Sequence, residues 1–336
     1  MKNNVLYIGN VLSNKGKTTT TIETLSEHLS EMYVLKIASN KSNKILRLLD
    51  MIRLLYKNRR TTDFVLIDTY STINFYYALI ISQLCRFFNL KYIPILHGGN
   101  LENRLKNNPK MCRSVFSKAY KLVAPSNFLK TVFKKYGYKN VEYIPNSIEI
   151  DNYKFKNRSI KSINLLWVRS FSSIYNPEQA PLILEALLEK KYDATLTMVG
   201  PDVDGSLIKV KHLVKEKNLD VKFTGKLSKS EWIAYSKHCN VFINTTNLDN
   251  TPVSVIEAMA LGLPVVSTNV GGMPFLISNN EDGILVEPKD ISAMANAIIK
   301  LKTDENFRNK LVINARNKVE NFSWQAVKPK WKAVLS

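Results

Sequence analysis

The stretch 248–268 reads L-D-N-T-P-V-S-V-I-E-A-M-A-L-G-L-P-V-V-S-T and predicts a helix followed by a strand. Thr251 followed by Pro252 indicates a helix start, because a capping hydroxyl then precedes a proline at the first helical position. The helix expected over 253–261 is apolar nearly all round, so we expect it to be buried. A glycine and a proline end it before the apolar run 265–267, which predicts a strand.

This helix predicts a binding site for an anion at its start and for a polar group in its interior. The unpaired N–H groups and positive dipole end at a helix N-terminus suit a diphosphate. Glu257 is the only charge within the apolar helix, and a buried carboxylate needs a partner. A ribose with two adjacent hydroxyl donors would satisfy it. A core arginine or backbone amides would do so equally well, and the residues alone leave this choice open.

Outward from this stretch, short apolar runs alternate with helical patterns along both halves of the chain. The alternation predicts parallel strands and doubly wound α/β sheets. The expected strands are 5–8, 64–67, 92–96, 122–124, 142–144, 163–168, 195–199, 221–224, 241–244 and 265–267. The expected helices are 18–32, 43–56, 76–88, 127–136, 181–189, 207–216, 230–237, 252–261, 291–301 and 324–335.

The length of 336 residues exceeds what one hydrophobic core usually supports, so two domains are expected. A polar, charged stretch at 149–162 predicts the linker between them. In sheets of this kind a ligand lies outside the carboxyl ends of the strands. We expect an N-terminal domain over 1–155, a C-terminal domain over 160–320 and a last helical segment over 322–336.

Composition favours a globular protein in a reducing compartment. Apolar residues make up 45% and charged residues 23% of the chain. The most apolar stretch, 75–88, is interrupted by polar residues and is shorter than the ~20 residues that a membrane crossing needs. The three cysteines, Cys85, Cys112 and Cys239, are far apart and lack metal-ligand spacing. We therefore expect reduced thiols, no metal site and a cytoplasmic location.

Four explanations are open for the formal charge of +20, and composition alone does not distinguish them. Nucleic acid, an anionic membrane surface and a phosphorylated substrate are acidic partners. A compositional bias toward lysine, asparagine and isoleucine, typical of AT-rich genomes, is the fourth. The segment 104–139 concentrates ten cations with interleaved aromatic residues, a pattern that suits lipid headgroups at the inner face of the cell membrane. Single-stranded nucleic acid would suit it equally, but no nucleic-acid module signature accompanies the segment.

A phosphate loop is not expected at the N-terminus, although G-N-V-L-S-N-K-G-K-T resembles one. The pattern requires four residues between the first glycine and Gly-Lys-Thr, whereas Gly9 and Gly16 have six between them. We expect a flexible strand-to-helix turn there, with Gly16 easing the bend.

The stretch around Glu257 resembles the signature of the family-4 retaining glycosyltransferases with the GT-B fold, in which two acids sit eight positions apart. The resemblance implies that Glu257 binds the nucleotide ribose and that Asp249 contacts the donor sugar, although the family usually has glutamate there. It places the sugar and diphosphate along the following helix start, at Thr251, Pro252, Val253 and Ser254.

Three further segments of the C-terminal half resemble the same family. W-V-R-S-F places Arg169 on the diphosphate, and V-G-P with F-T-G-K-L places Gly200, Lys226 and Leu227 at the phosphates and the base. The family's second phosphate cation, a lysine, is missing here, and Tyr175 and Asn176 stand near its position. Either a tyrosine hydroxyl with helix amides or another lysine such as Lys226 is expected to replace it.

The N-terminal half and the chain's last helix complete the resemblance. L-H-G-G implies that His97 lies near the donor sugar, and A-P-S-N-F-L-K and Y-I-P-N-S-I place Ser126 and Asn146 at the cleft. F-S-W resembles the helix by which the family's chain returns to the N-terminal domain. The implied architecture is two Rossmann-like domains facing a central cleft.

The resemblance implies transfer of a hexose or N-acetylhexosamine from a nucleotide-diphosphate sugar, with retention and without a required metal or cofactor. The acceptor expected is a cell-surface polysaccharide, a lipid-linked glycan or a protein. Two alternatives stay open: an epimerase or phosphorylase of the same fold, and a basic nucleic-acid-binding module. The four histidines of the chain weaken the epimerase, which needs additional acids and histidines in the cleft.

Overall fold

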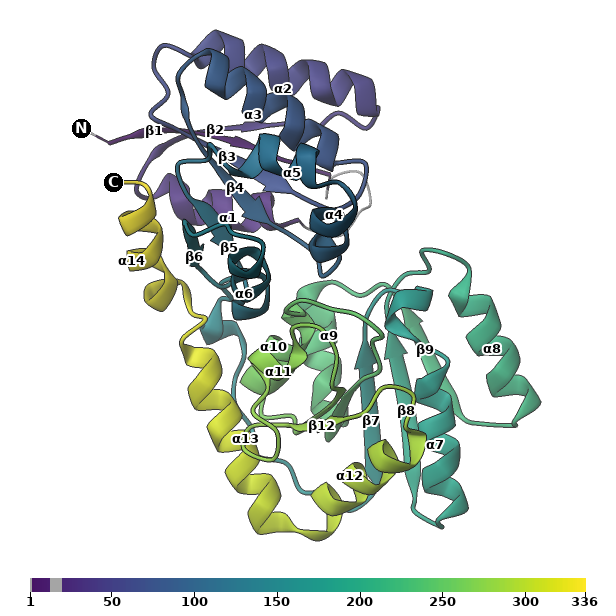
Figure 1. Ribbon diagram of the computed structural model, residues 1–336. Helices are drawn as coiled ribbons and strands as arrows, with labels where there is room; N and C mark the ends of the chain where they lie inside the picture. Colours follow the sequence, from purple (N-terminus) through teal and green to yellow (C-terminus); the bar gives the residue numbers. More distant parts are fainter. Residues whose placement is uncertain (1, 13–19) are drawn as a thin grey trace. The chain divides into compact units, whose positions relative to one another are not determined.

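The computed structural model describes residues 2–12 and 20–336, and the chain forms two compact units (Figure 1). The first contains the residues up to Ser147 together with Trp324–Ser336, and the second contains Ile148–Ser323. The turn between Gly9 and Gly16 lies largely outside the described residues. No helix in the described part of the chain is long and apolar enough to cross a membrane.

The first unit is built on a parallel six-stranded sheet with the order β2-β1-β3-β4-β5-β6. Its strands are β1 (Asn4–Ile8), β2 (Val34–Ala38), β3 (Phe64–Thr69), β4 (Lys91–Leu96), β5 (Leu122–Ala124) and β6 (Val141–Tyr143). Its helices are α1 (Thr21–Ser30), α2 (Lys44–Asn58), α3 (Phe75–Phe87), α4 (Leu101–Asn107), α5 (Pro109–Phe116), α6 (Asn127–Lys135) and α14 (Trp324–Val334).

Helices cover both faces of this sheet, because its central strands are apolar on both sides. One core joins the sheet to α2, α3, α5 and α6, and α2 and α3 lie above the sheet in Figure 1. A second core joins the opposite face to α1 and α14, with Trp324 and Trp331 buried in it.

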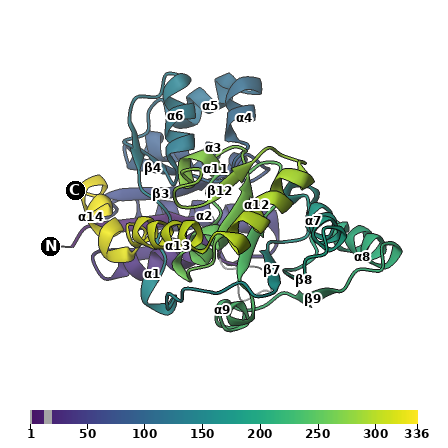
Figure 2. The ribbon, with the colours of Figure 1, turned by 90° about the horizontal axis from the view of Figure 1, so that it is seen from below.

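The second unit repeats the plan with the strand order β12-β11-β10-β7-β8-β9. Its strands are β7 (Ile163–Val168), β8 (Ala194–Val199), β9 (Val221–Gly225), β10 (Val241–Asn244), β11 (Val265–Thr268) and β12 (Ile284–Val286). Its α-helices are α7 (Gln179–Glu189), α8 (Ser206–Glu216), α9 (Lys229–Tyr235), α10 (Val253–Ala260), α11 (Met273–Leu276), α12 (Ile291–Thr303) and α13 (Glu305–Glu320). Helix α12 lies beside α7 on one face (Figure 2), and α10 packs with α13 on the other.

These two sheets confirm the predicted α/β fold with two Rossmann-like domains. The ten expected strands are present, and the structure adds β2 and β12. Strand β2 was not predicted because Lys36 interrupts its apolar run V-L-K-I-A; it lies at the sheet edge, and only Ala38 is buried. Helices α4, α5, α11 and α13 were also not predicted, and α13 carries mostly polar and charged residues.

The first unit ends earlier than the sequence predicts. Residues 148–155 were expected in the N-terminal domain, but they pack with the second unit. Ile148 and Tyr153 are buried there in one core with α10 and the end of α13. Their burial explains the difference: Ile148 directly precedes the predicted linker and Tyr153 lies within it, and the polar residues around them gave no sign of a core.

Candidate functional site

The carboxyl edge of the second sheet holds the predicted donor-site residues. The strand order reverses between β7 and β10, which is where sheets of this type bind ligands. Residues that follow β7, β8, β9 and β10 are, in that order, Arg169, Gly200, Lys226 with Leu227, and Asp249. The fold thus brings residues from four loops to one edge of the sheet.

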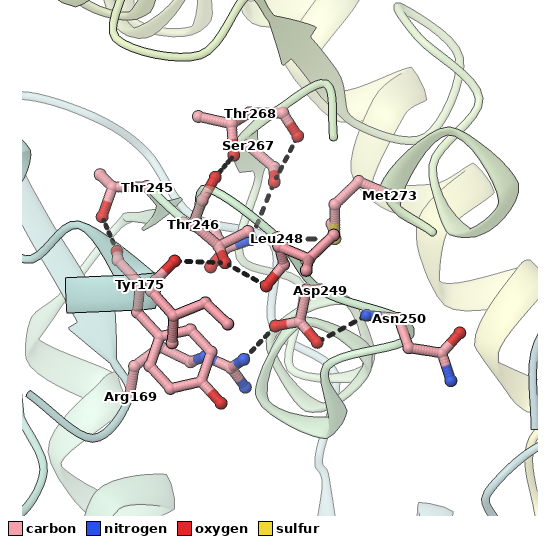
Figure 3. Close-up of polar contacts among 12 residues, drawn as sticks. Arg169, Tyr175, Thr245, Thr246, Leu248, Asp249, Asn250, Ser267, Thr268 and Met273 are labelled. Atoms are coloured by element: carbon pink, nitrogen blue, oxygen red, sulfur yellow. Dashed lines mark hydrogen bonds and ion pairs between the residues drawn. The ribbon is translucent and has the colours of Figure 1, made fainter. Parts of the chain in front are cut away.

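Arg169 and Asp249 form an ion pair across this reversal point (Figure 3). Their side chains are 15% and 14% exposed, so the pair is largely but not fully withdrawn from water. Arg169 Nε is buried and has no hydrogen-bond partner among the described residues. A buried guanidinium N–H without an acceptor is costly, and an anionic ligand would satisfy it.

Tyr175 lies at the place of the expected lysine and supports Arg169 with its ring. The guanidinium carbon of Arg169 is 3.9 Å from the ring centroid, a stacked cation–π contact. The Tyr175 carbonyl accepts a hydrogen bond of 2.9 Å from Thr245 Oγ1, which in turn accepts one of 3.0 Å from Trp167 Nε1. These contacts fix the ring beneath Arg169 (Figure 3), a role that the sequence did not reveal.

Gly200 approaches the backbone of Arg169. Its φ is +151°, and an added Cβ would lie 1.8 Å from the Arg169 carbonyl oxygen. The sequence placed Gly200 at the phosphates. In the structure, Gly200 lies close to the backbone of Arg169. Gly200 therefore holds the segment that carries Arg169 against β8.

Two glycines that the sequence left unassigned hold the loop of Asp249. Gly272 N donates a hydrogen bond of 2.9 Å to the Asp249 carbonyl oxygen. A Cβ added to Gly271 would lie 2.2 Å from the carbonyl oxygen of Asp249, and a Cβ added to Gly272 would lie 1.8 Å from the carbonyl oxygen of Asn250. Their spacing gave no signal, because glycines in a turn and glycines packed on a distant loop look alike in sequence.

Replacing Gly272 by alanine is expected to lower the free energy of unfolding by about 1–3 kcal/mol, because the clash is with backbone that cannot rotate away. It should also weaken binding of a nucleoside diphosphate, since the Asp249 loop must move. Urea unfolding and calorimetry would measure both. Gly205→Ala is the control: its φ of +83° strains alanine, yet no atom lies within 4 Å. Loss of nucleotide affinity in both variants would contradict the role in the Asp249 loop.

The start of α10 differs from the expected capping arrangement. The helix begins at Val253, and the cap position is Pro252 in an extended conformation without a side-chain cap, so Thr251 does not cap it. The prediction was wrong because the proline sits one position earlier than assumed. Ser254 Oγ, in the first turn, is buried and has no hydrogen-bond partner among the described residues. An unpartnered hydroxyl beside free helix N–H groups fits an incoming anion.

Glu257 lies inside α10 and is 4% exposed. Its Oε1 accepts a hydrogen bond of 2.5 Å from the Tyr153 hydroxyl and is 2.9 Å from Lys229 Nζ. Burial, and secondly the charge of Glu257, raises the pKa of Tyr153 well above its usual range, so this tyrosine stays a donor. The partners are thus a tyrosine and a lysine, neither the arginine nor the backbone amides that the residues suggested, and both contacts fall on one carboxylate oxygen.

His97 belongs to a buried polar cluster in the first unit. It follows β4, and its Nε2 lies 2.8 Å from Oδ1 of Asp68, the penultimate residue of β3. Tyr7 donates a 2.9 Å hydrogen bond to the same oxygen, and the Tyr70 ring stacks on His97 at 4.8 Å. The sequence predicted His97 but not these partners.

This cluster also lies where its strand order reverses, between β1 and β3. An added Cβ at Gly9, the residue after β1, would lie 2.4 Å from Asp68 Oδ2. That oxygen is buried and has no hydrogen-bond partner among the described residues. Ser126, which the sequence places at the cleft, follows β5 and accepts a hydrogen bond of 3.0 Å from Leu129 N as the cap of α6.

Residues 149–318 match the model of a family described as glycosyl transferases group 1. The capsular polysaccharide biosynthesis glycosyltransferase CapM of Staphylococcus aureus is 33% identical over 143 residues, which cover 42% of this chain and 37% of CapM. A galactosyltransferase of Escherichia coli, named for UDP-Gal and a GlcNAc-diphosphoundecaprenol acceptor, is 34% identical over 85 residues, 25% of this chain and 22% of that one. The matched segments therefore span less than half of these relatives.

Solved structures share the whole fold at low identity. Sucrose-phosphate synthase from Thermosynechococcus elongatus aligns with a TM-score of 0.82 and 18% identity, over 99% of this chain and 98% of the other. HepE from Anabaena in complex with UDP-glucose aligns with a TM-score of 0.76 and 15% identity, over 99% of both chains. These likenesses establish the fold.

Proposed function

Because the chain belongs to the group 1 glycosyl transferases, we propose that it transfers a sugar from a nucleotide-diphosphate donor to a glycan or glycolipid acceptor. One observation carries the proposal. At the reversal point of the second sheet, Arg169 Nε is buried and has no hydrogen-bond partner among the described residues, and the same holds for the buried Ser254 Oγ in the first turn of α10. Both groups can donate hydrogen bonds, as a diphosphate requires.

The chemistry proposed is electrostatic. As the bond between sugar and diphosphate breaks, negative charge grows on the leaving phosphate oxygen. Arg169 and the N–H groups at the start of α10 would stabilise that charge, since preorganised donors need no rearrangement. The departing oxygen would take the acceptor's proton, and the sugar would keep its anomeric configuration. We assign no general base in the chain.

The remaining donor contacts follow from the same edge. Glu257 has one oxygen engaged by Tyr153 and Lys229, and we assign its other oxygen to the ribose. Asp249, paired with Arg169, would turn toward hydroxyls of the donor sugar when the diphosphate takes over that cation. Lys226 and Leu227 follow β9 and are assigned to the base side of the nucleotide. In the first unit, His97 is assigned to the transferred sugar.

The names of two relatives support a proposal for the acceptor class. CapM is named for capsular polysaccharide, and the galactosyltransferase is named for a diphosphoundecaprenol acceptor. We propose a hexose or N-acetylhexosamine transferred to a cell-surface polysaccharide or its lipid-linked precursor, at the inner face of the cell membrane.

Thermal denaturation with a panel of nucleotides and nucleotide sugars tests the proposal. UDP and UDP-glucose are the first choices, because the HepE complex contains UDP-glucose and the galactosyltransferase is named for UDP-Gal. A hundredfold excess over Kd should stabilise the protein by about 2.7 kcal/mol. Release of nucleoside diphosphate with acceptor present, and an unchanged anomeric configuration in the product, would then establish retaining transfer. No stabilisation by any nucleoside diphosphate would overturn the proposal.

A further inference from the structure

The basic segment 104–139 has its cations outside and most of its aromatic rings inside. Phe116 and Phe133 are buried in the core of the first unit, and Phe116 packs against Phe133 and Tyr138 with centroids 4.9 and 5.6 Å apart. Tyr136 alone among the aromatic residues of 104–139 is exposed, at 37%. This segment can attract an anionic surface, but it offers little apolar area to enter one.

Helix α2 presents the apolar surface that the basic segment lacks. Its inner side buries Met51 and Leu55. A second stripe repeats at positions i, i+4, i+7 and i+11 and therefore lies along one line of the helix. The stripe consists of Ile45, Leu49, Ile52 and Tyr56, of which Ile45, Leu49 and Tyr56 are 70%, 55% and 56% exposed.

Two neighbours extend this surface. Leu46 on the same helix is 56% exposed, and Phe87 at the end of α3 is 78% exposed. Phe87 continues to Tyr56 through Phe88, with centroids 5.1 and 6.0 Å apart. Large apolar side chains gathered on one exposed helix mark an interaction site.

The charges around the stripe are positive. The exposed cations of α2 and its flanks are Lys41, Lys44, Arg53, Lys57 and Arg60. The one acid of α2, Asp50, is half-buried and accepts a hydrogen bond of 2.6 Å from Ser39 Oγ. Neither β2 nor α3, which both pack against α2, contains an acidic residue.

These positive charges distinguish between three possible partners of the stripe: a second copy of the chain, a nucleic acid and a lipid surface. A second copy of the chain would bring two cationic helices together, and like charges directly opposed are unfavourable. A nucleic acid would pair with the cations but leave the leucine and isoleucine side chains unused. An anionic lipid surface would contact both the cations and the apolar side chains, because a basic amphipathic helix lies in the headgroup plane with its apolar side chains inserted.

We propose that α2 docks on a bilayer containing acidic phospholipid, with Ile45, Leu46, Leu49 and Tyr56 entering the interface. Helix α2 begins six residues after β2 ends, so Ile45 and Leu46 lie near the carboxyl edge of the first sheet, the edge at which β4 leads into His97 (Figure 1). Docking there would hold that edge close to a lipid-linked acceptor. The lipid-linked acceptor in this inference rests on the proposed function. The docking surface itself is inferred only from the exposed residues of α2.

Flotation with vesicles of phosphatidylcholine, with and without phosphatidylglycerol, tests the docking surface. The wild-type chain should float with the anionic vesicles and should lose binding as salt is raised. Ile45→Ser combined with Leu49→Ser should weaken partitioning by about a hundredfold, because two inserted side chains are lost. Arg53→Gln with Lys57→Gln should lower the preference for phosphatidylglycerol. All four side chains are exposed, so the fold should tolerate the changes.

The matched control is Ile208→Ser with Ile313→Ser, which removes two side chains that are 73% and 49% exposed in the second unit. It should float like the wild type. Equal loss in both double variants, or no binding by the wild type, would overturn the docking surface. A wild-type dimer that the Ile45/Leu49 variant converts to a monomer would instead assign the stripe to a second copy.

Leu49→Cys carrying an environment-sensitive fluorophore gives a second readout, because the three native cysteines are buried. Its emission should shift to the blue with anionic vesicles, and an unchanged spectrum would contradict insertion. Stabilisation by nucleoside diphosphates should be the same in the wild type and in the Ile45/Leu49 variant. Failure of docking and failure of the transferase proposal are therefore separate results.

Discussion

Arg169→Lys is expected to slow sugar transfer by about a hundredfold to a thousandfold, which is the effect of removing one preorganised donor to a developing oxyanion. Lysine keeps the charge but loses the planar fork, the stacking on Tyr175 and the Nε, which has no partner among the described residues. The loss should fall mainly on kcat, because the charge at the leaving oxygen grows only as the bond breaks. Steady-state kinetics with a saturating acceptor would measure it.

Two variants of Tyr175 accompany this experiment. Tyr175→Phe keeps the ring beneath Arg169 and should leave kcat within a few-fold of the wild type, whereas Tyr175→Ala removes that support and should lower it. If Tyr175→Phe were as damaging as Tyr175→Ala, the hydroxyl itself would contact the diphosphate. If Arg169→Lys kept full activity, the assignment of Arg169 to the leaving group would be wrong.

Glu257→Ala is expected to remove most of the stabilisation by nucleoside diphosphates. A hydrogen bond to a charged acceptor contributes about 1.5–3 kcal/mol, so the affinity should fall by roughly ten- to a hundredfold or more. The unliganded protein should also be less stable by about 1–3 kcal/mol, because the Tyr153 hydroxyl stays buried without its acceptor. Calorimetric titration and urea unfolding would separate the two effects.

The double variant Glu257→Ala with Tyr153→Phe distinguishes a ligand contact from a structural contact. Removing both partners should restore part of the lost stability, since no buried polar group is then left unpaired. Nucleotide binding should stay weak in the double variant and close to normal in Tyr153→Phe alone. Recovered binding in the double variant would show that Glu257 serves only the fold.

Local sequence patterns were sufficient to predict the architecture. In several contacts of the site they also pointed to one of the two residues, but not to its partner. Alternating apolar runs and helical periods follow from which faces must be buried, so they predicted the parallel sheets. The apolar helix around Glu257 predicted its own burial and that of the carboxylate. Arg169 was named from the resemblance of W-V-R-S-F to the family, and it directly follows the buried strand β7. Edge strand β2 escaped prediction because Lys36, which an edge position tolerates, interrupts its short apolar run.

Which side chains meet was decided by the tertiary structure. Arg169 and Asp249 are 80 positions apart, and Tyr153 and Glu257 are 104 apart. No periodicity links such pairs. Arg169 and Asp249 follow different strands at the point where the sheet reverses its order, and Tyr153 reaches Glu257 of α10 from the segment before β7. The exposed stripe of α2 could not be predicted from the sequence either. Apolar residues on both sides of a helix indicate burial on both sides, and only the packing shows which side is covered. The sequence by itself determined the two α/β domains and the buried helix at 253–261; only the fold decided the partners of its carboxylate.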